Sequence, residues 1–544
     1  MSTSRELLEM RFKRFLHYGS EQPIYKAGER VSNKYYDLEK IPSLIKLING
    51  QIHQSVIEII TKVAKEESSL WPDSVTYALA YCSHQDFSPE LKNEAYKILR
   101  LVCKTARDII LFVKFHRELR GTKGGGNGFK RAVGQWYLVW MPFDLADILL
   151  HQKSYHGWKH TDVLRIAHIK PISIEQQLLF TYATRGLKEA TTRFGESPNE
   201  QVQELLEYIT TVESFRKIKE PEKAARALAV ELHNLERVPT NLLKYQEIWN
   251  ELITHMDVKT LLDNLQRLSI LGFLKNNTVT VLKVVDVFNN LWKAETFKGH
   301  PSRVYIELLT YEKAAKYCLE IANKMNHPVS NLVPPKKPPK CNLVIKSALI
   351  TFFYSLFKFQ KPTGLRYLVA VDVRPKMFSD RCHYSLYLTP IEAATAISIS
   401  LVRTEPDGNV TIGVYREAKG ELEVMSFDKT SEINSYDTAF AQVKKGITPG
   451  PASVASAIHW AETNKRPVDV FLILSNYMVS TTGTRPSINQ YRAAMNLPNA
   501  KVVTCSLSGN VRTHKDVEGQ NMLSVVGFDD KVCRLIEAFA KGSF

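Results

Sequence analysis

Apolar residues between about residue 38 and residue 325 recur every three to four positions, the spacing of one buried helix face. Short breaks interrupt this pattern at 86–89, 195–198, 220–221 and 300–301. Ser88 and Ser197 each precede a proline, so we expect both to cap a helix N-terminus. About a dozen helices joined by short turns predict stacked helical hairpins, an α-solenoid. Residues that show this spacing, in three separate segments, are Leu44, Ile45, Ile48, Ile52, Val56, Ala95, Ile98, Leu99, Val102, Val202, Leu205, Leu206 and Ile209.

The pattern changes from Leu365 onward, where short apolar runs alternate with helical spacing. This alternation predicts a doubly wound α/β domain with a parallel sheet. Ligands bind such sheets at the carboxyl ends of strands, where Asp372, Ser475 and Asn476 stand. We expect strands at 367–373, 410–415, 422–427, 468–474, 502–508 and 523–526, and helices at 391–404, 453–463, 488–495 and 531–540.

The two patterns predict two domains, an all-α domain over 1–361 and an α/β domain over 362–544. Residues 334–340 are rich in proline and lysine and cannot be helical throughout, so 331–340 is expected to be a basic insert. A further helix is expected over 348–359.

Charge is unevenly distributed along the chain of 544 residues, whose formal net charge is +16. Residues 104–170 hold 12 basic and 5 acidic residues, whereas 171–330 hold 20 of each. Residues 331–361 add 6 basic residues and no acidic ones. A focused surplus of this kind favours a polyanionic partner such as nucleic acid.

The ends and the cysteines indicate an intracellular protein. The N-terminus shows no secretory pattern, and no run of about 18 apolar residues predicts a membrane span. The 7 cysteines are scattered without a Cys-x-x-Cys pair, so we expect buried free thiols rather than disulfides or a zinc site. We expect a cytoplasmic location, with the nucleus as a second, and no membrane partner.

Residues 104–170 combine cations with aromatic side chains, as RNA recognition requires. Trp136, Tyr137, Trp140, Tyr155 and Trp158 lie among the basic residues. The alternative is a solvated charged face over an aromatic core, and for Trp136 we favour the core. The candidate RNA-binding residues are Arg117, Arg120, Lys123, Lys130, Arg131, Lys153, Lys159, Arg165, His168 and Lys170.

Enzymatic motifs are weak by comparison. The glycine-rich segment 121–130 departs from the Gly-x4-Gly-Lys-Ser/Thr pattern and follows no strand, so we expect a flexible loop beside RNA. His156 and His160 have the spacing of a metalloprotease pair but lack its glutamate. No catalytic residues are assigned, and we expect a protein that is not an enzyme.

Several segments resemble one known family. The runs 14–21, 130–137, 157–171, 237–243 and 261–265 resemble the TROVE domain of the Ro ribonucleoprotein (Ro autoantigen) family. The runs 362–372 and 401–405 resemble that family's C-terminal von Willebrand factor A domain. Matching segments run in order from about residue 11 to the C-terminus.

The resemblance implies HEAT-like helical hairpins that the A domain closes into a ring. It implies Y RNA bound on an outer basic surface and single-stranded ends of misfolded small RNAs in a central hole. His168 matches the family's Y RNA contact, whereas His151 and Tyr155 replace basic residues implicated in binding misfolded RNA. A monomer acting in RNA quality control is expected, with protein partners for the A domain.

The family's metal-ion site looks degenerate in this chain. The expected Asp-x-Ser-x-Ser motif has become Asp372, Arg374 and Lys376, with Ala452 at the threonine position and Asn476 at the distal aspartate. A hard divalent cation needs several oxygen ligands, so we predict neither a metal nor another cofactor. Arg374 or Lys376 is expected to pair with Asp372. The alternative to RNA binding is a protein-interaction scaffold with incidental basicity.

Overall fold

The computed structural model describes residues 2–28, 41–121, 126–151, 154–230, 235–275, 278–322, 340–416, 422–446, 450–477, 479–480, 482–509 and 521–544. These residues form two compact units. Unit 1 comprises Met1–Gln22, Val31–Leu252 and Phe544, and unit 2 comprises Pro23–Arg30 and Ile253–Ser543. The domain border predicted at 361/362 and the predicted closure into a ring stay predictions.

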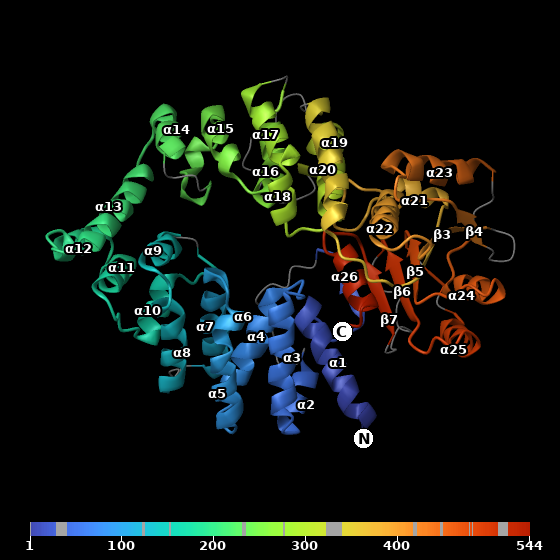
Figure 1. Ribbon diagram of the computed structural model, residues 1–544, viewed down its shortest axis with the longest axis horizontal. Helices are drawn as coiled ribbons and strands as arrows, with labels where there is room; N and C mark the ends of the chain where they lie inside the picture. Colours follow the sequence, from blue (N-terminus) through green and yellow to red (C-terminus); the bar gives the residue numbers. More distant parts are fainter. Residues whose placement is uncertain are drawn as a thin grey trace. The chain divides into compact units, whose positions relative to one another are not determined.

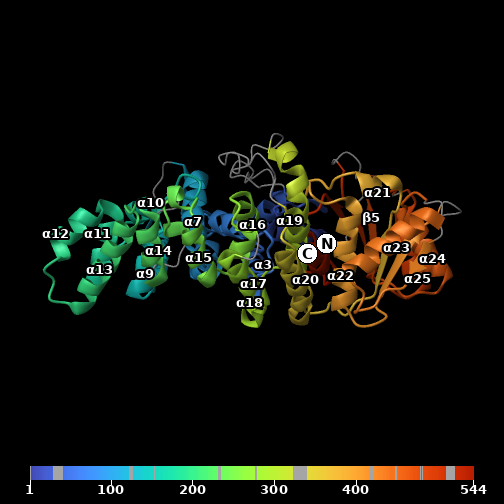
Figure 2. The ribbon, with the colours of Figure 1, turned by 90° about the horizontal axis from the view of Figure 1, so that it is seen from above.

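Unit 1 is a succession of helices joined by short connections, as the apolar spacing predicts. Consecutive helices pack against each other, α11 on α12 and α12 on α13, and more distant pairs such as α4 and α7 also meet (Figure 1 and Figure 2). The helices are α1 (Ser2–Tyr18), α2 (Pro42–Asn49), α3 (His53–Glu66), α4 (Pro72–Ser83), α5 (Pro89–Lys97), α6 (Leu99–Val102), α7 (Ala106–Arg120), α8 (Gly126–Leu138), α9 (Pro142–Leu150), α10 (His160–Ala167), α11 (Ile174–Arg185), α12 (Leu187–Phe194), α13 (Glu200–Phe215) and α14 (Pro221–Val230). Helix α15 (Gln246–His255) runs from unit 1 into unit 2.

Local capping explains where several helices begin. Ser88 accepts a hydrogen bond from the Leu91 amide with Pro89 in the first turn, so its predicted cap is confirmed. The prediction for Ser197 is wrong. Helix α13 begins later, where Asn199 accepts from the Val202 amide, and Ser197 supports the Asn199 amide instead. The Ser88 and Asn199 side chains thus each accept a hydrogen bond from an amide that has no partner within the first turn of its helix.

Unit 2 begins with further helices and continues into the α/β region. Its first helices are α16 (Val258–Ile270), α17 (Val279–Asn289), α18 (Leu291–Thr296), α19 (Pro301–Ala322) and α20 (Leu343–Ser355). The strands are β1 (Ile24–Lys26), β2 (Tyr367–Val371), β3 (Val410–Tyr415), β4 (Leu422–Met425), β5 (Val470–Ser475), β6 (Lys501–Ser506) and β7 (Met522–Val526). The helices among them are α21 (Pro375–Ser379), α22 (Pro390–Thr404), α23 (Ile433–Gly446), α24 (Val454–Thr463), α25 (Thr484–Ala494) and α26 (Val532–Ala540).

The strands form one sheet in the order β1-β7-β6-β5-β2-β3-β4. Every neighbouring pair is parallel except β3 and β4, which are antiparallel. The predicted all-parallel sheet is therefore corrected to a mixed one, because the short connection between β3 and β4 leaves no room for a crossover. Strand β1 was not expected at all, and it pairs Tyr25 with Val525 at one edge.

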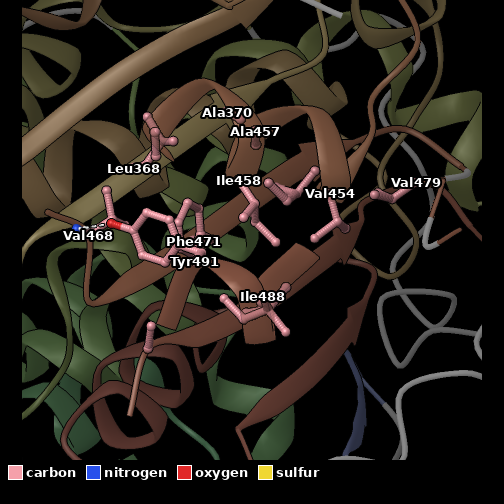
Figure 3. Packing of buried hydrophobic residues seen from close by; sticks show 14 of the residues in the cluster. Leu368, Ala370, Val454, Ala457, Ile458, Val468, Phe471, Val479, Ile488 and Tyr491 are labelled. Carbon is pink, nitrogen blue, oxygen red and sulfur yellow. Dashed lines mark hydrogen bonds between the residues drawn. The ribbon is translucent and has the colours of Figure 1, made fainter. Parts of the chain in front are cut away.

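The inner strands β2, β5, β6 and β7 are buried on both faces, so they are almost continuously apolar, whereas edge strand β4 is partly exposed. On one side α24 and α25 cover β5, and Phe471 meets Tyr491 edge to face at 5.0 Å (Figure 3). The Tyr491 hydroxyl accepts a hydrogen bond from the Val468 amide at 2.7 Å (Figure 3). The prediction of a helical region followed by an α/β region is thus confirmed.

The described cysteines form no disulfide. Cys82, Cys103, Cys382, Cys505 and Cys533 are free and buried, and Cys341 is free and half-buried. Among the described helices, none combines the length and the apolar character that crossing a bilayer requires.

Candidate nucleic-acid interface

The end of α7 presents one cation over an aromatic ring. The Arg117 guanidinium carbon lies 5.7 Å from the centre of the Trp158 ring, within cation–π range. Tyr155 and Trp158 exchange two backbone hydrogen bonds of 2.9 and 3.0 Å around His156 and Gly157. Both central residues have positive φ, 53° and 84°, so the chain makes a tight turn that places Trp158 against α7.

The other basic residues of α7 are less accessible. The Arg120 side chain is 13% exposed and its Nη2 lies 3.3 Å from Asp86, whose pKa is lowered chiefly by a hydrogen bond from Lys92. Lys114 is 8% exposed and pairs with Glu118. Of Lys114, Arg117 and Arg120, Arg117 therefore offers its charge to solvent. The predicted residues Lys123 and Lys153 lie outside the described residues.

Helix α8 carries the aromatic residues into the interior. Trp136 is 2% exposed and donates from Nε1 to the Cys103 carbonyl at 2.7 Å, so the core interpretation is confirmed. Tyr137 is fully buried against His160. On the same helix Lys130 is half-buried and Arg131 is exposed. The predicted loop over 121–130 is shorter than expected, because Gly126–Leu138 is helical.

The end of α10 lies against α8. Ile169 packs on Gly134, where a Cβ would meet its methyl group at 3.8 Å. This contact places the exposed residues His168 and Lys170 beside the helix that carries Arg131, one turn before Gly134. His168 ends α10 in the left-handed conformation, with φ of 47°, which projects the next residues away from the helix.

Helices α7, α8 and α10 pack mutually, so the predicted cations come from three neighbouring helices (Figure 1). Arg117, Arg131, Lys159, Arg165, His168 and Lys170 are exposed, Lys130 is half-buried, and Arg120 is largely withdrawn. We call the first seven of these residues the basic cluster. Its chemistry suits phosphate oxygens, because arginine and lysine donate several hydrogen bonds and carry fixed charge.

The sequence prediction missed a pocket of about 390 Å³ at the end of α9. Arg237 forms part of its wall, is 8% exposed, and donates to Asp147 at 2.7 Å and to the Tyr208 hydroxyl at 2.9 Å. His151 bonds the Asp147 carbonyl at 2.8 Å and faces Glu236 at 3.3 Å. The motif that begins at Arg237 is recognisable in the sequence, but the sequence could not predict that Asp147 and His151 lie next to Arg237.

The carboxyl edge of the sheet in unit 2 holds a buried ion pair. Asp372 has no exposed surface. Its carboxylate accepts from the Arg374 amide at 2.9 Å, from Nε at 3.0 Å and from Nη2 at 2.6 Å. Ser475 also donates to it at 2.8 Å. These hydrogen bonds to Asp372 raise the pKa of Arg374. Arg374, rather than Lys376, is the partner of Asp372.

The remaining positions of the metal-ion motif supply few oxygen ligands. Ala452 is 1% exposed and has no side-chain oxygen. Asn476 donates its amide to Asp380 at 3.1 Å, and the Lys376 ammonium lies 5.9 Å from the Tyr477 ring centre. The described residues contain no group of three or more acidic, histidine or cysteine side chains that could hold a metal. A cation would have to displace the Arg374 guanidinium, so these residues do not fit a divalent metal.

Comparisons with known proteins agree with this architecture. Residues 366–540 match the family model of the Ro60 vWA domain. The RNA-binding protein RO60 of Caenorhabditis elegans is 23% identical, over 98% of this chain and 88% of that protein. The RNA-binding protein RO60 of Deinococcus radiodurans is 25% identical, over 83% of this chain and 78% of its own length. The crystal structure of the D. radiodurans RO protein superimposes with a TM-score of 0.82 at 21% identity, covering 99% and 100% of the two chains.

Proposed function

We propose that the chain is a member of the Ro60 family and an RNA-binding component of a ribonucleoprotein. The observation that carries the proposal is the basic cluster, in which α7, α8 and α10 present cations from three packed helices. Two relatives, which align with 98% and 83% of the chain, are named RNA-binding proteins. The scaffold alternative does not account for the concentration of basic residues in 104–170, where 12 basic residues stand against 5 acidic ones.

We propose further that the basic cluster docks the stem of a Y-type RNA, and that the protein also takes single-stranded ends of misfolded small RNAs. Exposed arginine and lysine side chains suit the phosphates of a stem, and His168 and Lys170 follow one another closely enough to contact adjacent groups. We propose a monomer that works in RNA quality control in the cytoplasm and also the nucleus, and that does not act as an enzyme.

The proposal for the A-like region is a protein-binding surface that works without a divalent metal. Arg374 neutralises Asp372 inside the protein, so the charge that a metal would balance is already balanced. Tyr477 is 47% exposed beside Lys376 and offers an aromatic contact at the same edge.

A substitution at His168 tests the docking role. His168→Ser is expected to weaken binding of a Y-type RNA hairpin more than binding of poly-A, because His168 is assigned to the structured RNA. His168→Asn provides a second variant, since asparagine tolerates the left-handed conformation of this position. Filter binding at one salt concentration would measure both RNAs. Equal loss for the two RNAs in both variants would contradict a role of His168 in docking a stem.

A further inference from the structure

A second pocket, of about 350 Å³, lies where α10 and α12 begin and α11 ends. Its walls include His151, Lys159, His160, Tyr182, Ala183 and Glu213, which come from α10, α11, α13, the residue that follows α9 and the turn before α10. The volume falls in the range of about 300–1,000 Å³ that is typical of small-molecule sites. Several lining residues belong to motifs that the sequence analysis singled out, but the sequence did not show that they enclose a pocket.

One wall carries a buried histidine with unused hydrogen-bonding capacity. His160 is 5% exposed, and its Nδ1 lies 2.7 Å from the Tyr137 hydroxyl. Within the described part of the chain, its Nε2 has no hydrogen-bond partner. Burial lowers the pKa of His160 to about 4, so the ring is neutral at pH 7 and can donate or accept one further hydrogen bond. Buried polar atoms ordinarily have a partner. This atom has almost no solvent-accessible surface, so a ligand could reach it only if a neighbouring side chain shifted.

The interior of the pocket is electrically balanced. Glu213 accepts hydrogen bonds of 2.6 Å from both the Tyr182 hydroxyl and Arg216, which neutralises its carboxylate. Leu149, Ala183 and Leu187 add apolar surface. A bare phosphate would meet the Glu213 carboxylate here, whereas a planar base with polar edges and apolar faces suits a wall of this composition.

The rim of the pocket belongs to the basic cluster. Lys159 is exposed immediately before α10, and Arg165 of the same helix donates to the Thr184 carbonyl at 3.3 Å in the pocket wall. RNA held by the basic cluster would therefore pass the opening. Unpaired bases in RNA turn out of the stack and enter protein sites of this kind.

We propose that this pocket receives one unpaired base of the bound RNA, with Lys159 contacting the phosphate of the same nucleotide. This inference rests on the proposed RNA binding and adds to it a preference for RNA with an accessible, unstacked nucleotide. The base would lie beside Tyr182, and Glu213 would offer an acceptor to an amino group.

Filling the pocket tests the inference with the full-length protein. Ala183 is half-buried on α11, and Ala183→Met replaces one good helix former by another while occupying the cavity. Wild type and variant would be titrated with a short oligoadenylate and with an abasic oligomer of the same length. The variant is expected to bind oligoadenylate about tenfold more weakly and the abasic oligomer equally well.

A charge variant covers the case in which Ala183→Met disturbs folding. Lys159→Gln is expected to weaken oligoadenylate binding more than Lys219→Gln, an exposed lysine of the neutral region that lies outside the pocket. Unchanged oligoadenylate binding by both Ala183→Met and Lys159→Gln would overturn the base pocket while leaving RNA binding intact. If wild type bound neither oligomer nor a structured RNA hairpin, the proposed function would fail and this inference with it.

Discussion

At the scale of single residues, Asp372 and Arg374 form a unit that replaces a missing ligand. The Asp372 carboxylate is fully buried and receives hydrogen bonds from the amide and the guanidinium of a residue two positions later. A buried carboxylate without a cationic partner is costly, so the protein supplies its own cation from the adjacent loop. Arg374 thereby supplies the positive charge and the hydrogen-bond donors that the buried Asp372 carboxylate requires.

Removing this cation should destabilise the protein and change its response to metal. Arg374→Ser is expected to lower the free energy of unfolding by about 2 kcal/mol, because Asp372 loses its charged partner. Adding Mg²⁺ should restore part of this loss, since serine provides an oxygen ligand beside Asp372. Denaturant unfolding of the wild type should be the same with Mg²⁺ and with a chelator.

The matched control is Arg416→Gln, which breaks the exposed pair between Arg416 and Glu423. An exposed ion pair contributes about 1 kcal/mol or less, so this variant should lose less stability than Arg374→Ser and gain nothing from Mg²⁺. Stabilisation of the wild type by Mg²⁺, abolished in Asp372→Ala, would show that a metal binds despite Arg374.

At the scale of elements, the contact between α7 and α8 depends on a histidine that is buried without charge. His116 stacks on Phe129 with 4.4 Å between ring centres and is 2% exposed. Burial, together with Arg120 nearby, lowers the pKa of His116 to about 3. In the unfolded chain the same ring titrates near its usual pKa of about 6.5. Acid therefore favours the unfolded chain, which binds a proton that the folded protein excludes.

His116→Phe should keep the stacking and remove this acid sensitivity. We expect the wild type to lose free energy of unfolding as the pH falls from about 6.5 towards 3, and the variant to lose less over the same interval. Urea unfolding at several pH values would measure the difference. His459→Phe, at an exposed histidine, is the control and should keep the wild-type slope. Parallel pH profiles for wild type and His116→Phe would show that His116 becomes protonated within the folded protein.

The elements also show what the sequence could predict. Long amphipathic helices and buried strands such as β3 and β5 follow from spacing alone, because their apolar stripes extend over several turns or a whole strand. Strand β1 has three residues, too few for a pattern, and it exists because Pro23–Arg30 packs with unit 2. Helix α23 was missed because polar residues dominate its sequence.

The candidate sites divide in the same way. The basic cluster could be predicted because charge density is a local property of the sequence and because motif resemblance pointed to His168. The base pocket could not be predicted, since its walls come from positions as distant as 149, 182 and 213. The low exposure of the Arg120 side chain also could not be predicted, because Arg120 pairs with Asp86, which is distant in the sequence. Spacing predicts which face of a helix is apolar, but not which remote residue covers it.

At the scale of the whole molecule, the basic residues behind the net charge of +16 have different roles. The basic cluster concentrates cations on three helices, whereas residues 171–330 are neutral. Arg374 uses its charge internally, against Asp372. We therefore expect RNA affinity to depend on the residues of the basic cluster and not on the total charge.

The salt dependence of RNA binding tests this claim most directly. Wild type would be compared with Arg131→Gln/Arg165→Gln/Lys170→Gln and with a matched control, Lys188→Gln/Lys217→Gln/Lys219→Gln, which removes the same charge from exposed positions outside the basic cluster. Binding of a Y-type hairpin would be measured at several salt concentrations. We expect the slope of log affinity against log salt concentration to become shallower by about 2 to 3 in the first variant, because each lost phosphate contact releases about one counterion fewer. The slope should stay unchanged in the control. Equal slopes for the two triple variants would contradict this expectation.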